Sequence, residues 1–222
     1  MKAFTIVLAL LVLILPGVVA EGGKEGASAE PTRAETLIVD HLGGRDANSG
    51  SFNTWVPGFA SGSKGCQQFM AHSLWMTEYA KGEVVNVLAK EPPIYNAGFT
   101  QMTANLREGI YWSDGVEFTS ADVVFTVETL KKTKGMVYNN ELNLYVDKVT
   151  APSKYQVVFD LKTPNSRFHA YFLDRWGALR FMAKHVWEKV ADPLTFTNYP
   201  PVSIGAYVLE NFDPNGNWWM WR

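Results

Sequence analysis

The sequence is short of three features that would each point to a particular class of protein. It contains one cysteine, Cys66, so no intramolecular disulfide can form and the fold must be stabilised by packing of its core. Its net charge is only -2, which argues against a nucleic-acid partner, because such partners select a basic surface. Its longest apolar run, Ala3–Leu15, is shorter than the about 20 residues that a membrane-spanning helix needs.

Motifs of common catalytic and metal sites are also missing from the sequence. It has neither the G-x-S-x-G turn of serine hydrolases nor the G-x-x-x-x-G-K-[ST] loop that binds nucleotide phosphates. Asp114 has no second copy of its motif, as an aspartic protease would require, and is better explained as a turn residue. The four histidines lack metal-ligand spacing; they are His41, His72, His169 and His185. The sequence therefore predicts no catalytic residue, no metal site and no cofactor.

The N-terminal segment has the parts of a signal peptide. Lys2 supplies a positive start, Ala3–Leu15 an apolar core, and Val18 to Ala20 the small residues that a signal peptidase reads. We expect cleavage after Ala20, with residues 1–20 as signal peptide, and a periplasmic or extracellular location. An uncleaved N-terminal anchor is the alternative. Because Cys66 does not follow the apolar core, the protein is not expected to be a lipoprotein.

A tether and then a folded domain are expected after the signal peptide. Residues 21–34 have no periodic apolar positions and many Gly, Ala, Ser and Glu residues, which is typical of a flexible tether. The apolar, β-branched run Thr36–Val39 predicts a first, buried strand, so the folded domain is expected from residue 35. With 47% hydrophobic and 19% charged residues, the composition is that of a globular protein.

Local patterns predict a mixture of helices and strands, without the repeat that would indicate a solenoid. A helix is expected over Gln67–Glu78, and a turn at Gly82 leads into a short strand. Further strands are expected at 102–106, 155–161 and 206–210, and helical stretches at 167–173 and 185–190.

The segment from Leu106 to Leu130 gives the clearest local prediction. Ser113-Asp114-Gly115 predicts a tight β-hairpin between residues 110–112 and 116–118, because Asp and Gly tolerate the left-handed backbone of such a turn. Thr119 stands three residues before Asp122, a capping pattern that starts a helix at Ser120 and that we expect to end near Thr133. The apolar residues on one face of this helix are Val123, Val127 and Leu130.

The same segment carries a family resemblance. LREGIYWSDGVEFTSADVVFTVETL resembles the signature hairpin and helix of the large extracellular solute-binding proteins of ABC importers, the family 5 group that includes oligopeptide, dipeptide, nickel and cello-oligosaccharide binders. Segments 81–89 and 149–161 are similar to the family's flanking regions. Pro201–Tyr207 is similar to its later Pro-Val-Gly-x-Gly-Pro-Tyr stretch, with departures at Ser203 and Ala206. The resemblance runs from about Glu35 to Arg222.

The resemblance implies an α/β (mixed α+β) fold, the N-terminal lobe of a two-lobed periplasmic-binding-protein-like fold of type II, cluster C. Family members are typically more than twice as long, so residues 35–222 are expected to be the N-terminal part of the solute-binding domain, with the second lobe missing. Arg222 is then an artificial end, and we expect an apolar surface there that leaves Trp218, Trp219 and Trp221 partly uncovered.

The resemblance also implies a function without catalysis. The expected protein is the substrate-binding component of an ABC transporter, which captures an oligosaccharide or oligopeptide outside the cytoplasmic membrane and delivers it to the permease subunits. The alternative from another class is an exported carbohydrate-active enzyme, whose aromatic residues would line a sugar cleft. A chaperone-like or signalling relative of the same family also stays open.

Aromatic residues make up 14% of the sequence and supply the candidate ligand contacts. Asn53 and Trp55 lie in a long Gly-rich loop that resembles the Asn-x-Phe/Trp-x-Pro-Gly stretch of oligosaccharide-type members, and Trp176 follows a polar helix end. Sugars lie flat on Trp rings while side chains such as Asn bind their hydroxyls, so the choice leans slightly to an oligosaccharide over a peptide. Core packing is the alternative for each Trp, and the preferred one for Trp112 and Trp187.

Overall fold

The computed structural model describes residues 38, 48–57, 66–174 and 178–222. The chain divides into two units, Met1–Asp40 and His41–Arg222, and the second contains every helix and strand among the described residues. The predicted signal peptide and tether lie outside the described residues. Of the strand expected at Thr36–Val39, only Ile38 is described; it belongs to no strand and is 64% exposed, so it lacks the burial expected of it.

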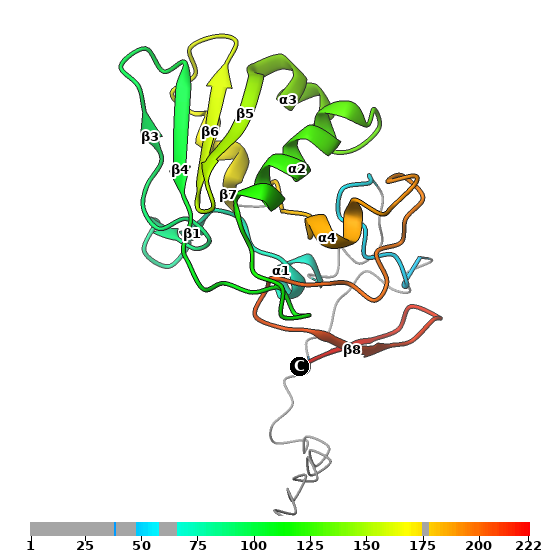
Figure 1. Ribbon diagram of the computed structural model, residues 1–222. Helices are drawn as coiled ribbons and strands as arrows, with labels where there is room; N and C mark the ends of the chain where they lie inside the picture. Colours follow the sequence, from blue (N-terminus) through cyan, green and yellow to red (C-terminus); the bar gives the residue numbers. More distant parts are fainter. Residues whose placement is uncertain (1–37, 39–47, 58–65, 175–177) are drawn as a thin grey trace, which may run out of the picture. The chain divides into compact units, whose positions relative to one another are not determined.

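The larger sheet of the second unit has four strands in the order β3-β4-β6-β5, and all its pairs are antiparallel (Figure 1). Its strands are β3 (Ile94–Tyr95), β4 (Gln101–Asn105), β5 (Val146–Ser153) and β6 (Gln156–Leu161). Along β6 every second residue is buried, namely Val157, Phe159 and Leu161. This alternation marks a sheet with one face on the core. The strands expected at 102–106 and 155–161 are confirmed.

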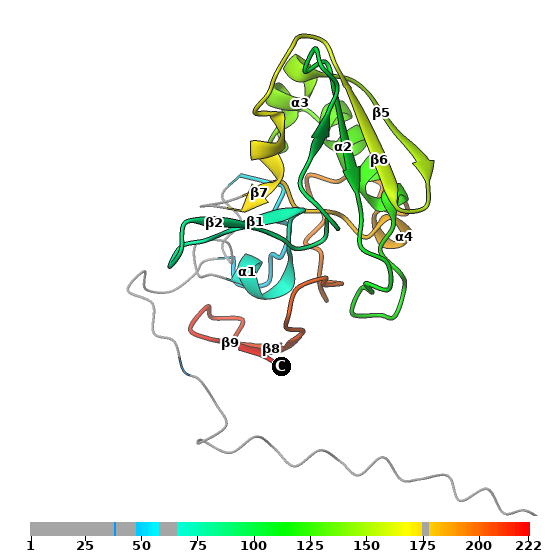
Figure 2. The ribbon, with the colours of Figure 1, turned by 90° about the vertical axis from the view of Figure 1, so that its left-hand side faces the viewer.

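Two helices cover the β5 and β6 side of this sheet, α2 (Ser120–Lys132) and α3 (Asn139–Tyr145) (Figures 1 and 2). Helix α2 begins as predicted. The Thr119 hydroxyl accepts from the backbone N–H of Ala121 at 3.3 Å, and the Thr119 N–H donates to Asp122 Oδ2 at 2.8 Å. The three apolar residues predicted to share a face of α2 are fully buried, and the helix ends at the C-cap Thr133.

The predicted hairpin over residues 110–118 is present as a short ladder. Tyr111 and Glu117 form a bridge, and the backbone N–H of Trp112 donates to Val116 O at 2.8 Å. Gly115 has a φ of 83°, a left-handed conformation that glycine adopts without strain.

A second sheet has the order β2-β1-β7, with β1 (Trp75–Glu78) antiparallel to β2 (Glu83–Asn86) and parallel to β7 (Leu173–Asp174). The helix expected over Gln67–Glu78 is wrong beyond its first turn. Helix α1 spans only Cys66–Met70, because the residues of β1 pair with strands on both sides and tertiary pairing overrides local propensity. The predicted turn at Gly82, with a φ of 71°, is confirmed.

The remaining elements follow β6 along the chain. They are the 3-10 helix η3 (Phe168–Phe172), α4 (Lys184–Trp187), β8 (Leu209–Phe212) and β9 (Trp219–Trp221). The helical stretch expected at 167–173 is thus a 3-10 helix, and the one expected at 185–190 is a single turn. The strand expected at 206–210 begins at Leu209 and pairs with β9. Among the helices of the described ranges, none is long and apolar enough to cross a lipid bilayer.

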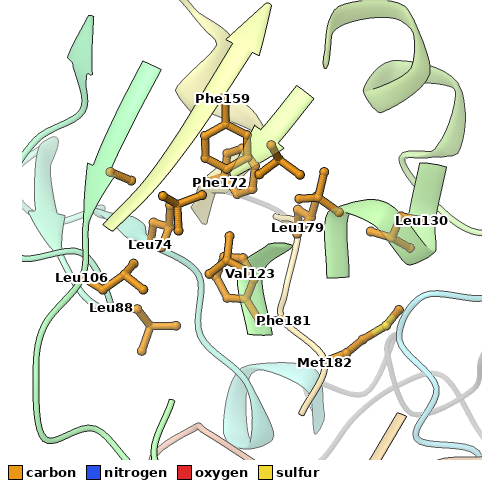
Figure 3. Close-up of a cluster of buried hydrophobic side chains, with 14 of the residues drawn as sticks. Leu74, Leu88, Leu106, Val123, Leu130, Phe159, Phe172, Leu179, Phe181 and Met182 are labelled. Carbon is orange, nitrogen blue, oxygen red and sulfur yellow. The ribbon is translucent and has the colours of Figure 1, made fainter. Parts of the chain in front are cut away.

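One apolar core joins the four-stranded sheet, α2 and the chain around residues 179–187. Figure 3 shows part of it, with side chains from strands, from α2 and from the segment before α4; the labelled residues are Leu74, Leu88, Leu106, Val123, Leu130, Phe159, Phe172, Leu179, Phe181 and Met182. Trp112 and Trp187 are buried, as predicted for them, and Cys66 is buried as well. A smaller cluster of Phe52, Met70 and Ala71 packs against the β8–β9 hairpin.

Candidate functional site

A hollow of about 470 Å³ lies among segments that are far apart in the sequence. Its walls come from Thr54 and Trp55, from residues 136–141 before and at the start of α3, and from Ala178 and Arg180, with Gln67 of α1 beside them. We call it the Arg180 hollow. Because four separate stretches of chain converge on it, a molecule bound there would meet several polar groups at once.

Hydrogen bonds to and from Trp55 join three of these stretches to one another. The backbone N–H of Val137 donates to Trp55 O at 2.8 Å, and the indole N–H of Trp55 donates to Arg180 O at 2.9 Å. The ring of Trp55 also packs edge-on against Trp187 of α4, with ring centroids 4.8 Å apart. The walls of the hollow are therefore fixed by contacts with the packed core.

Arg180 is the buried charge of the hollow, with a side chain only 3% exposed. Its Nη2 pairs with Asp174 Oδ2 of β7 at 2.7 Å, and its Nη1 donates to Gln67 Oε1 at 3.2 Å. Burial lowers the pKa of Arg180, while the negative charge of Asp174 acts in the opposite direction. A guanidinium keeps its proton in proteins, so the Arg180–Asp174 pair is an ion pair with no net charge.

Two hydrogen-bonding atoms in the walls of the hollow have no partner. Within the described residues, the buried side-chain atoms without one are Thr54 Oγ1, Trp112 Nε1, Arg180 Nε and Trp221 Nε1. Thr54 and Arg180 both line the Arg180 hollow. A buried polar atom without a partner costs about 1–3 kcal/mol, so folded proteins retain few of them. Both atoms are closed off from solvent, so they are unpaired within the packed protein although their residues line the hollow.

Other ionisable groups lie around the hollow. Tyr138 forms part of the wall in a left-handed conformation, with a φ of 62°, and burial raises the pKa of its hydroxyl, so it stays protonated. Glu141 is an exposed carboxylate of the same wall. Burial, followed by the charge of Arg180, lowers the pKa of His72, which favours its neutral form. The described residues contain no group of three or more His, Cys, Asp or Glu side chains that could hold a metal ion.

The three residues predicted to contact a ligand have different surroundings in the structure. Trp55 lines the Arg180 hollow but is only 4% exposed. Asn53 is buried, and its amide N–H groups donate to Pro193 O at 2.8 Å and to Phe196 O at 2.7 Å. Trp176 lies outside the described residues. Contact of these three residues with a ligand stays a prediction.

The sequence reasoning missed Thr54 and Arg180. A signal for Arg180 was present, because it is the one charged residue in the otherwise apolar stretch 178–183. A charge inside such a stretch marks a buried ion pair or a functional site. Thr54 carries no comparable signal, since only the folded chain brings it to the hollow.

Comparison with known proteins gives one family and many similar structures. The family model described as "Bacterial extracellular solute-binding proteins, family 5 Middle" matches residues 83–222. A solved periplasmic oligopeptide-binding protein of an oligopeptide ABC transporter from Thermotoga maritima is similar, with 24% identity and a TM-score of 0.58, covering 66% of this chain and 26% of that chain. A comparison with curated proteins found no match.

Two further similar structures contain different ligands. A mannohexaose-bound structure of the Thermotoga maritima protein has 24% identity and a TM-score of 0.57, covering 65% of this chain and 26% of that chain. The oligopeptide-binding protein AppA from Bacillus subtilis, in complex with a nonapeptide, has 23% identity and a TM-score of 0.58, covering 68% of this chain and 30% of that chain. The chain thus spans between 26% and 30% of the length of these proteins. The likeness confirms the predicted fold class, a mixed α/β part of a periplasmic-binding-protein fold.

Proposed function

Because this chain belongs to family 5 of the bacterial extracellular solute-binding proteins, we propose that it is the substrate-binding component of an ABC transporter. In this role it captures a small solute outside the cytoplasmic membrane and delivers it to the permease subunits. The observation that carries the proposal is the family match over residues 83–222, which takes in the hairpin, the four-stranded sheet and α2.

The proposal covers two ligand classes, oligosaccharides and oligopeptides. Similar solved structures hold mannohexaose in one case and a nonapeptide in another. The aromatic content of the sequence favours the oligosaccharide, because sugar rings lie flat on aromatic side chains.

Export forms part of the same proposal. Lys2, the apolar core Ala3–Leu15 and the small residues up to Ala20 support a cleaved signal peptide and a periplasmic or extracellular location, without lipid attachment. N-terminal sequencing of the exported protein tests this, and Glu21 is the first residue expected. An exported protein that still began at Met1 would contradict it.

Binding without chemical change is the third part of the proposal. A retaining glycosidase needs two carboxyl groups about 5 Å apart at the scissile bond. Among the described residues that line the Arg180 hollow, Glu141 is the only carboxylate. Asp174 is the ion-pair partner of Arg180. A bound oligosaccharide or peptide should therefore be recovered unchanged after incubation.

Ligand-induced stabilisation of the protein translated from the complete reading frame tests the function. A ligand that binds only the folded state stabilises it by RT ln(1 + [L]/Kd), about 2.7 kcal/mol at a hundredfold excess over Kd. Cello- and manno-oligosaccharides in one series, and mixed di- to pentapeptides in another, are added before thermal unfolding. We expect one series to raise the melting temperature and to be recovered intact. If neither series does so, or if the ligand is hydrolysed, the proposed function is wrong.

A further inference from the structure

Residues 178–183 form a buried stretch of chain that belongs to no helix or strand and that places Arg180 in the wall of the hollow. Leu179, Phe181 and Met182 of this stretch lie among the core side chains in Figure 3. Backbone N–H and C=O groups in such a place need hydrogen-bond partners. Because the stretch is not paired in any sheet of the described structure, side chains of other elements supply several of these partners.

Two buried hydroxyl groups hold the stretch on either side of Arg180. Before Arg180, Ser73 Oγ lies 2.8 Å from Leu179 O. After it, the backbone N–H of Met182 donates to Thr126 Oγ1 of α2 at 2.8 Å. Ser73 is 1% exposed and Thr126 is 0% exposed, so water does not compete for either contact. The backbone of Arg180 is therefore fixed from both sides.

Thr126 is oriented for its contact by a second hydrogen bond. Its hydroxyl donates to Asp122 O, one turn earlier on α2, at 2.7 Å, so its proton is used within the helix and a lone pair is left for the N–H of Met182. Packing alone does not call for a hydroxyl at a fully buried helix position, because burying one is tolerated only when it is hydrogen-bonded. The hydroxyl thus serves the contact with the stretch.

We propose that Thr126 and Ser73 are positioning residues for a solute that binds in the hollow, because they fix the place of Arg180 in its wall. The inference rests on the proposed function. Neither residue is among the described residues that line the hollow, so they act through the stretch that they hold. The guanidinium of Arg180 contacts Asp174 and Gln67 at 2.7 and 3.2 Å, and it keeps both contacts only while its backbone stays in place. A shift of the stretch therefore changes the surface that a solute meets.

Hydrogen exchange of the Trp55 indole N–H tests the positioning in the complete protein without a solute. This N–H donates to Arg180 O at 2.9 Å, so its exchange rate, followed by NMR, reports whether the stretch stays in place. Thr126→Val removes the acceptor of the Met182 N–H at nearly constant shape. We expect the Trp55 indole of this variant to exchange about tenfold faster, the factor that corresponds to one lost hydrogen bond.

Three comparisons separate positioning from a general loss of stability. The indole N–H of Trp75 donates to Glu91 O at 2.9 Å, so its exchange rate in each variant is the reference for the Trp55 rate. Val127→Ala, at the fully buried neighbour on α2, lowers stability but removes no partner of the stretch, so it should raise both indole rates equally. Thr126→Ser keeps the hydroxyl and should restore the wild-type ratio of the two rates.

Solute affinity is measured on the same variants by calorimetry, well below their melting temperatures, so that each is folded. The solute is the most strongly stabilising member of the cello- and manno-oligosaccharide series or of the di- to pentapeptide series. We expect Thr126→Val to weaken binding about tenfold, and Thr126→Ser and Val127→Ala to bind as the wild type does. Ser73→Ala, which removes the partner of Leu179 O, should also weaken binding and replaces Thr126→Val if that variant does not fold.

Each outcome decides a separate point. If Thr126→Val and Ser73→Ala change the ratio of indole rates and the affinity no more than Val127→Ala does, the two hydroxyls are only structural and the inference is overturned, although the proposed function stands. A changed ratio with unchanged affinity overturns the role in binding. If neither series stabilises the wild-type protein, the proposed function fails and the role in binding fails with it.

Discussion

Trp55 shows how a residue chosen as a ligand contact can serve the fold first. Its indole N–H donates to Arg180 O at 2.9 Å and its ring packs against Trp187, so both its polar and its apolar groups are used inside the protein. Its neighbour Asn53 is used in the same way, with its amide donating to two backbone carbonyls. If a substitution of Trp55 or Asn53 weakens binding, the effect can therefore come from a lost ligand contact or from a destabilised fold.

Trp55→Ala should destabilise the fold strongly. Removing a buried aromatic side chain costs about 3–5 kcal/mol, and here it also leaves the carbonyl of Arg180 unpaired. Trp55→Phe keeps most of the ring and should cost less, about 1–3 kcal/mol. Urea unfolding measures both, and Trp218→Phe, at a position 46% exposed, is the control expected to change stability little. A Trp55→Ala variant as stable as wild type would show that the loop is not packed as described.

The hydrogen-bonded contact between Asp114 and His185 predicts a pH dependence of stability. Asp114 Oδ2 lies 2.6 Å from His185 Nε2 and joins the hairpin to α4. Partial burial raises the pKa of Asp114, but hydrogen bonds from His185 and from the backbone N–H of Val116 outweigh it and hold the pKa below its usual value. Because the folded-state pKa is the lower one, the pair stabilises the fold above the unfolded-state pKa, and this stabilisation is lost as the pH falls through the folded-state pKa.

Asp114→Asn isolates that contribution. At neutral pH the variant should be less stable than wild type by up to about 1 kcal/mol, since both side chains are about a third exposed. The difference should shrink as the pH is lowered below the folded-state pKa of Asp114, which urea unfolding at several pH values would measure. Asp147→Asn, at an exposed aspartate of β5, should show no such trend. A difference that stays constant between neutral and acidic pH would rule out the contact between Asp114 and His185 as its cause.

Helix α2 is the element that the sequence predicts best, and its cap explains why. Thr119 and Asp122 are three residues apart, so their hydrogen bonds form whenever the chain makes that turn. Asp122 does more than cap the helix, because its second oxygen accepts from the backbone N–H of Lys184 at 3.0 Å and ties α2 to α4. The same carboxylate therefore fixes a local and a distant part of the fold.

Substitutions at the two ends of α2 separate these roles. Thr119→Ala should cost about 1 kcal/mol, the usual contribution of an N-cap side chain. Asp122→Ala should cost more, because hydrogen bonds to a charged group contribute about 1.5–3 kcal/mol each, and this buried carboxylate accepts two from Thr119 and one from Lys184. Thr133→Ala, at the C-cap, keeps its backbone bond to Thr129 and serves as control. Equal losses for Thr119→Ala and Asp122→Ala in urea unfolding would contradict the link to α4.

Elements that depend on distant partners were the ones that local patterns missed. The local pattern predicts a helix where β1 forms, because the pairing of β1 with β7 joins Trp75 to Leu173, which no local pattern reveals. Strand β5 was not predicted, since register shifts at its two ends break the alternation that would mark a strand. The same limit applied to the site, where Thr54 and Arg180 meet only in the folded chain.

At the scale of the whole second unit, the β8–β9 hairpin divides its apolar side chains between two faces. Trp219 and Trp221, two residues apart on β9, pack with Phe212 against the cluster that contains Phe52. Trp218 and Met220 alternate with them and are 46% and 45% exposed. The expectation that Trp218, Trp219 and Trp221 are partly uncovered is confirmed most strongly for Trp218.

The exposed side chains of Trp218 and Met220 predict self-association of the 222-residue chain. Contiguous apolar surface on a folded protein attracts other apolar surface, and Tyr207 and Val208, just before β8, are exposed as well. Replacing Trp218 and Met220 together by Gln should reduce association in sedimentation velocity and leave the free energy of unfolding nearly unchanged, because both side chains already face solvent. Trp219→Gln, on the packed face of the same strand, should instead lower stability. A wild-type chain that sediments as a monomer at high concentration, or a double variant as unstable as Trp219→Gln, would show that the two faces are assigned incorrectly.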